Sequence, residues 1–188
     1  MSRIAVFGPA SELTEAIIDC LSRQDGQVVR VATAAVNPLA PANEDAIAAA
    51  FDGLGAITGL VCVTLDPRST ATGPLSWARW TEASRGIATI ALLGLRHGGP
   101  LVQPGGAIVL VAAPGPSDPA SEAAHGILLG LSRGASGGFA ARGIRVNRVA
   151  TDFTRNAADQ AEAVAFLVSD AARFVTGADI GRGRQEER

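Results

Sequence analysis

The sequence predicts a doubly wound α/β domain, in which helices cover both faces of a parallel sheet. Short apolar segments alternate with amphipathic segments along the chain of 188 residues. Two of the apolar segments, Gly59–Leu65 and Ala107–Ala112, are almost uninterrupted, which is typical of strands buried on both faces. Strands that alternate with helices favour right-handed crossovers and parallel pairing. The predicted architecture is therefore a three-layer α/β/α domain.

The elements follow one another in a regular order. The first strand, Arg3–Phe7, leads into the turn Gly8–Ser11, whose last residue can cap a helix. The predicted helices are Glu12–Arg23, Glu44–Leu54, Ser76–Arg96, Ala120–Arg142 and Ala157–Ser169. The other predicted strands are Gln27–Ala32, Gly59–Leu65, Ala107–Ala112 and Ile144–Val149. The segment Thr33–Asn43 is small and contains prolines, so we expect an irregular connection there.

Length and composition indicate one globular domain, residues 1–180, followed by a polar tail, residues 181–188. The net charge of -2 gives no field to attract nucleic acid or an anionic membrane. No apolar run is long enough to span a bilayer, and the N-terminus reads as a strand rather than a signal peptide. Cys20 and Cys62 lie in apolar segments and are expected to be buried thiols, not a disulfide or metal pair. These features predict a cytoplasmic protein.

Two residue types are missing from the whole chain. All 16 basic residues are arginine, and the tyrosine count is 0. Any mechanism that needs a phenol or an ε-ammonium group is therefore closed to this sequence.

The segment from His125 to Phe153, HGILLGLSRGASGGFAARGIRVNRVATDF, resembles the short-chain dehydrogenases/reductases from their active-site helix into the sixth strand. Gly143–Asn147 (GIRVN) matches that family's pattern in full. Further similar segments occur in order, at Gly105–Val109, Ala165–Asp170 and Val175–Gly177. The resemblance covers nearly the whole chain and implies a Rossmann-like parallel sheet.

The catalytic positions that the resemblance implies are all changed. The family's Tyr, which transfers the proton, falls at Ser121, and its Lys, which lowers the pKa of that Tyr, falls at His125. The family's Ser falls at Ala113, and its helix-borne Asn falls near Ser84. An aliphatic hydroxyl cannot replace a phenol as an acid near neutral pH. The family's usual mechanism is therefore not expected.

The cofactor positions are changed as well. Of the three glycines in the family's phosphate-binding turn, only Gly8 remains, and Glu12 stands in the place of the second. A carboxylate there repels a pyrophosphate. The acidic residue expected after the second strand falls at Ala32 or Thr33. We therefore expect no cofactor, with NAD(P) as the alternative.

The chain is also shorter than the resemblance implies. The stretch between Ala32 and Glu44 leaves no room for the family's third strand, and the substrate-covering lid after Phe153 is largely missing. The charged tail that follows Gly181 predicts that the last strand is short or absent.

The predicted helix Ala120–Arg142 carries glycines at three- or four-residue spacing, namely Gly126, Gly130, Gly134 and Gly137. Each interior glycine costs a helix about 1 kcal/mol relative to alanine, so a packing reason is expected. In the family the corresponding helix and its predecessor, here Ser76–Arg96, form a four-helix bundle between subunits. The resemblance thus implies a homo-oligomer, or pairing with a catalytically intact family member, through helices 76–96 and 120–142. Packing against the sheet is the alternative for part of the stripe.

Three functions follow as hypotheses. The first is a non-catalytic family member (a pseudoenzyme) that acts as a structural or regulatory subunit. The second is an NAD(P)-dependent oxidoreductase that acts on a carbonyl or alcohol with an altered site. The third is a cofactor-independent isomerase, lyase or cyclase that uses Ser121 and His125, which lie one helical turn apart, with Asp118 or Asp152 to orient them. A merely structural role for Ser121 and His125 remains the alternative to any catalytic role.

Overall fold

The computed structural model describes residues 2–24, 26–32, 44–64, 76–112, 118–150 and 156–181. Within this part of the chain six parallel strands form one sheet in the order β2-β1-β3-β4-β5-β6. The strands are β1 (Arg3–Gly8), β2 (Gln27–Ala32), β3 (Ile57–Val63), β4 (Val102–Ala112), β5 (Arg145–Ala150) and β6 (Asp179–Ile180). The predicted doubly wound sheet is confirmed, and no described strand lies outside β2.

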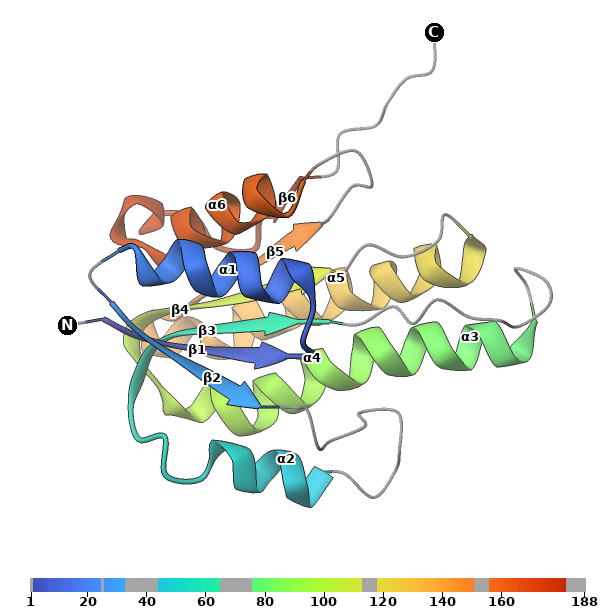
Figure 1. Ribbon diagram of the computed structural model, residues 1–188, viewed down its shortest axis with the longest axis horizontal. Coiled ribbons are helices and arrows are strands. Elements are labelled where there is room, and N and C mark those ends of the chain that lie inside the picture. The colour runs from blue at the N-terminus through green and yellow to red at the C-terminus, as the bar shows by residue number, and fades with distance from the viewer. Residues whose placement is uncertain are drawn as a thin grey trace, which may run out of the picture.

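The helices alternate with these strands along the chain (Figure 1). They are α1 (Glu12–Ser22), α2 (Glu44–Phe51), α3 (Trp77–Ser84), α4 (Ile90–Leu93), α5 (Pro119–Phe139) and α6 (Ala157–Val168). Side chains cap the N-termini of four of them, because Ser11, Ser76, Asp118 and Asn156 each accept a bond from a first-turn amide. The capping role predicted for the turn that ends at Ser11 is thus confirmed.

Two apolar cores flank the sheet. One core joins β-strand side chains to α1 and α6, as in the contacts of Ile17 and Val164. The other joins the opposite face to α2, α3, α4 and α5, where Phe7 packs at 5.1 Å from Phe51, ring centre to ring centre. Figure 1 shows α1 and α6 together on one side of the sheet. The central strands are buried on both faces, as their apolar sequences predict.

The single helix predicted for residues 76–96 is interrupted twice. Wider π-helical turns occur at Arg85–Thr89 (η2) and Gly94–Gly98 (η3), on either side of α4. At η3 the close packing explains the glycine: a Cβ on Gly94 would lie 3.1 Å from Phe7 Cδ1 and closer still to the sulfur of Cys62. Apolar periodicity does not distinguish a π-helical turn from an α-helical one, so the sequence does not reveal these interruptions.

The last strand is short, as predicted, and one ion pair holds it. Asp179 of β6 accepts two bonds of 2.7 Å from Nη1 of Arg148, which is 2% exposed on β5. The two-residue strand therefore replaces part of its missing apolar contacts with a charge-assisted bond. The tail beyond Gly181 lies outside the described residues.

Candidate functional site

The candidate site lies at the carboxyl edge of the sheet, where parallel strands of this architecture receive ligands. Four strands end at this edge, namely β1, β3, β4 and β5, and three helices begin there, namely α1, α3 and α5. Three positions discussed above, Ala113, Thr33 and Asp152, lie outside the described residues. The described side chains of the site come mainly from α3 and α5, which lie next to each other (Figure 1).

A buried arginine links these two helices. Arg79 of α3 is 3% exposed, and its Nε donates to Oδ2 of Asp118 at 2.9 Å. Its Nη2 donates to Oγ of Ser121, the residue at the position of the family's Tyr. The sequence analysis did not single out Arg79, because one arginine within an amphipathic helix gives no sign that it is buried. The structure thus places a cation beside the Ser121 hydroxyl.

Asp118 holds this group in place. Its Oδ1 accepts from the amides of Ala120 and Ser121, each at 2.9 Å, so the same carboxylate caps α5 and pairs with Arg79. Partial burial acts to raise the pKa of Asp118, but the Ser121 amide, the Arg79 guanidinium and the Ala120 amide outweigh it and lower the pKa below its ordinary value. Within the described part of the chain, Asp118 bonds Arg79 and two backbone amides, and these bonds do not involve His125.

His125 lies one turn along α5 from Ser121, on the same buried face. Ser121 is 1% exposed and His125 is 8% exposed. The predicted juxtaposition of the two side chains on one helix face is therefore observed, while a catalytic use of them stays a prediction.

Ser84, near the position of the family's Asn, is the last residue of α3, and η2 begins directly after it. Single π-helical turns frequently occur at functional sites.

Gly8, the retained glycine of the turn, has a packing reason to be there. A Cβ at this position would lie 2.5 Å from the carbonyl oxygen of Val63 and 2.8 Å from its Cβ. Thr14 takes the place of the third glycine, but its side chain is 1% exposed and turns back to donate to the Pro9 carbonyl at 2.7 Å. Packing against Val63 therefore explains Gly8, and this glycine alone does not demonstrate a phosphate site.

The turn before α1 has one feature of a pyrophosphate-binding turn and one charge that opposes such binding. The N-terminus of an α-helix of 11 residues, α1, lies directly after the glycine turn, which is the arrangement that binds phosphate groups. Glu12 is exposed at the first position of that helix, where its carboxylate interacts favourably with the helix dipole. The same carboxylate disfavours a second anion. Glu12 is thus the described side chain that most directly weakens a dinucleotide site.

The glycine stripe of α5 faces outward. A Cβ added to Gly126, Gly130, Gly134 or Gly137 would meet nothing within 4 Å. The expectation that packing against the sheet accounts for part of this stripe is therefore wrong for these four positions. These four glycines are exposed, and Leu92 of the neighbouring helix α4 is 53% exposed.

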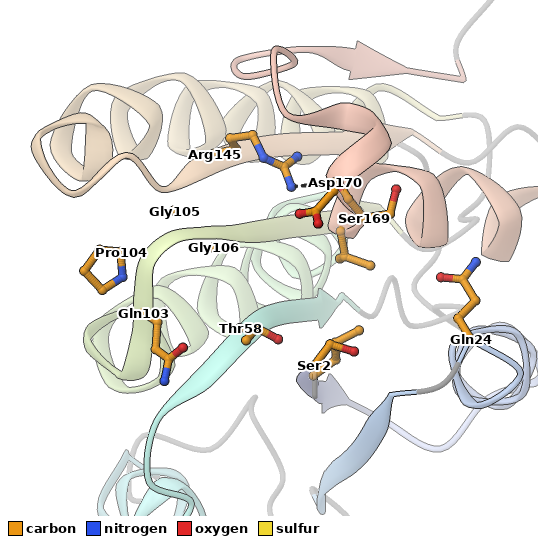
Figure 2. A pocket seen from close by; sticks show the side chains of 12 residues that line it. Ser2, Gln24, Thr58, Gln103, Pro104, Gly105, Gly106, Arg145, Ser169 and Asp170 are labelled. Atoms are coloured by element: carbon orange, nitrogen blue, oxygen red, sulfur yellow. Dashed lines mark hydrogen bonds between the residues drawn. The ribbon is translucent and has the colours of Figure 1, made fainter.

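A pocket of about 440 Å³ lies at the opposite, amino edge of the sheet (Figure 2). Arg145 lines it and donates to two carbonyls at the C-terminal end of α6, that of Leu167 at 2.6 Å and that of Ser169 at 3.1 Å. Burial lowers the pKa of Arg145, and the charge of Asp170, on the same wall, opposes that shift. The cation of this pocket is therefore already matched by a helix C-terminus and a carboxylate.

Two further functions receive no support from the described residues. These residues contain no cluster of three or more His, Cys, Asp or Glu side chains that could hold a metal ion. None of the helices in the described ranges is long and apolar enough to cross a membrane. The predicted burial of the two thiols is confirmed for Cys62, whose pKa burial raises to about 12, and is wrong for Cys20, which is half-buried.

The fold of this chain is similar to that of several solved structures. A short-chain dehydrogenase/reductase from Brucella ovis has a TM-score of 0.77 and 18% identity over 97% of this chain and 100% of its own. A second Brucella ovis structure of this family, in complex with a partially ordered NAD, has a TM-score of 0.75 and 18% identity over 96% and 99% of the two chains. A short-chain oxidoreductase from Pseudomonas aeruginosa PAO1, which contains an atypical catalytic centre, has a TM-score of 0.78 and 19% identity over 97% of each chain.

The fold is therefore that of the short-chain dehydrogenase/reductase oxidoreductases. No protein-family model matches the sequence, and no curated protein is similar to it at the sequence level. At identities near 18%, the likeness defines the architecture and leaves the chemistry to be argued from the site.

Proposed function

We propose that this chain is an oxidoreductase of the short-chain dehydrogenase/reductase type with an altered site, acting on a carbonyl or alcohol substrate. The observation that carries the proposal is the bond from the Arg79 guanidinium to the Ser121 hydroxyl. The family pairs a hydroxyl with a nearby cation, and here the pair is rebuilt from two helices instead of one. Likeness to an NAD complex and to an oxidoreductase with an atypical catalytic centre supports this choice.

In this proposal the chain's residues divide the work. The Ser121 hydroxyl accepts from Arg79, and in the proposal this polarised hydroxyl interacts with a substrate oxygen, where negative charge develops. His125 gives a proton to the substrate oxygen in reduction and takes it in oxidation, because imidazole is suited to proton transfer near neutral pH. Asp118 keeps Arg79 in position. The turn from Gly8 into α1 would hold NAD(P), which would supply or accept the hydride when bound.

The test is reduction of small aldehydes and ketones by the purified chain with NADPH or NADH. We expect slow turnover that falls roughly 100-fold or more in His125→Ala and in Ser121→Ala, because each removes a group used in the transition state. Ser136→Ala is the matched control, since Ser136 lies on the same helix and bonds Thr176 in an exposed pair. Equal turnover in His125→Ala and the unsubstituted chain contradicts the assigned role.

The second candidate is a non-catalytic subunit, which two observations favour. Ser121 is 1% exposed, so the residue at the position of the family's Tyr is enclosed within a network that links two helices. The glycine face of α5 is open for another helix to approach closely. In this reading the chain pairs in the cytoplasm with a second copy or with an intact family member through residues 76–96 and 120–142.

Native mass measurement of the complex purified from its own cells separates the two candidates. Recovery of an intact short-chain dehydrogenase in fixed ratio, together with loss of that association in Gly130→Leu, supports the subunit reading. Recovery of the chain alone or as a homomer, with dinucleotide-dependent turnover, supports the oxidoreductase reading.

A further inference from the structure

Among the described residues, β2 lies at the edge of the sheet and pairs with β1 only. β2 is the first strand of the sheet and pairs along all six of its residues with β1. The Gln27 amide donates to the Ser2 carbonyl at 2.9 Å, so Gln27 faces β1. Backbone groups alternate in direction along a strand, and the amides and carbonyls of Val28 and Arg30 therefore point away from the sheet. Within the described ranges no strand pairs with them.

The usual devices that protect a sheet edge are weak here. Edge strands are commonly very short, or carry proline or inward-pointing charges. The opposite edge follows this rule, because β6 has two residues. β2 has six residues, three of them valine and none proline. Its Val28 and Val29 are half-buried, one against each core, so the edge presents apolar surface on both sides of its backbone.

The one charged side chain of β2 does not guard the edge. Arg30 pairs with Glu15 of α1, with Nη1 and Oε1 at 2.6 Å, so its guanidinium lies over the face of the sheet that α1 covers. Because Glu15 neutralises it there, two copies of β2 can meet without an unbalanced like charge between them.

We propose that a second copy of this chain adds to the sheet at β2, antiparallel and about a two-fold axis. Such an interface is self-complementary, because the same patch serves both partners. With Val29 opposite its own counterpart on the axis, Arg30 of each copy faces Val28 of the other. Both residues have outward backbone groups, and each of these pairs exchanges two hydrogen bonds. The two six-stranded sheets become one continuous sheet.

This association is independent of the oxidoreductase and subunit proposals. It uses the outer edge of β2, whereas pairing through residues 76–96 and 120–142 uses the helices. The two surfaces can therefore be disrupted separately.

The test compares Arg30→Pro with Arg30→Ala by light scattering during gel filtration and by native mass spectrometry. Both variants remove the ion pair with Glu15, but only proline removes the outward N–H. We expect the unsubstituted chain and Arg30→Ala to dimerise, and Arg30→Pro to dimerise at least about tenfold more weakly, since two bonds are lost per dimer. A monomeric unsubstituted chain, or equal dimerisation of both variants, overturns the proposal.

A cross-link provides a second measurement that does not require the proline variant to fold. Residues opposite each other at a non-hydrogen-bonded antiparallel site have Cα atoms about 4.5 Å apart, which a disulfide can bridge. In a Cys20→Ser background, Val29→Cys is expected to form a disulfide dimer under mild oxidation. Leu92→Cys, at an exposed position of α4, is the matched control for pairing through residues 76–96 and 120–142. Failure of Val29→Cys to cross-link a dimeric protein refutes pairing at β2.

Discussion

Replacing Arg79 tests how strongly the Arg79–Asp118–Ser121 group joins α3 to α5. Arg79→Met keeps the length of the side chain and removes both the bond to Asp118, at 2.9 Å, and the bond to Ser121. Breaking a buried ion pair typically costs 3–5 kcal/mol, because a charge is left uncompensated. Asp118 keeps two amide donors and is 13% exposed, so we expect the lower figure of about 2–3 kcal/mol.

The assay is reversible unfolding in urea and on heating, followed by circular dichroism. For a domain of this size each kcal/mol lowers Tm by about 2–4 °C, so a loss of roughly 5–10 °C is expected. The double variant Arg79→Met/Asp118→Asn should lose less than the sum of the two single losses, because the residues share one interaction. A change below about 0.5 kcal/mol in Arg79→Met would refute the structural role assigned to this group.

Three further predictions follow from other parts of the molecule. Because the pKa of Asp118 is lowered in the folded state, its contribution to stability is complete above the ordinary value of 3.8 and is lost as pH falls through the lower folded value. The difference in unfolding free energy between the unsubstituted chain and Asp118→Asn should therefore narrow only below about pH 4. Gly130→Ala should stabilise the monomer by about 0.5–1 kcal/mol, since its Cβ meets nothing, whereas Gly94→Ala should destabilise it by about 1–3 kcal/mol through crowding against Cys62 and Phe7. Unfolding in urea measures both effects, and a loss of stability in Gly130→Ala would contradict an open glycine face. A thiol reagent should label Cys20 in the native protein and Cys62 only after unfolding, since Cys62 is buried with a pKa raised to about 12; rapid native labelling of Cys62 would contradict its burial.

The layers of the fold could be predicted from the sequence because burial dictates composition. Strands such as β3 and β4 are apolar at nearly every position since both faces are covered, and this pattern is visible in a linear sequence. The predicted bounds shifted by a few residues, as at β3, predicted from Gly59 and observed from Ile57. Strand ends depend on pairing between distant segments, such as the register shift between Ile57 and Gly59 opposite β4.

The site was less predictable because its central cation comes from an unexpected element. Ser121 and His125 could be placed on one helix face from their spacing alone. Arg79 could not be assigned to the site, since it lies 42 residues from Ser121 in sequence, and only tertiary packing brings the two together. The glycine stripe left two interpretations open, a surface for another helix and packing against the sheet, because spacing fixes which residues share a face and does not fix what that face contacts.

Binding of NADPH and NADH to the purified chain, by calorimetric titration, tests the central claim most directly. The proposed oxidoreductase predicts saturable binding of one of the two dinucleotides, and several-fold tighter binding by Glu12→Gln, because the carboxylate opposing the pyrophosphate is removed from the first turn of α1. Glu15→Gln, in the same turn, is the matched control, since its carboxylate is held by Arg30. Absence of binding in both the unsubstituted chain and Glu12→Gln would contradict the account and leave the non-catalytic subunit as the function to pursue.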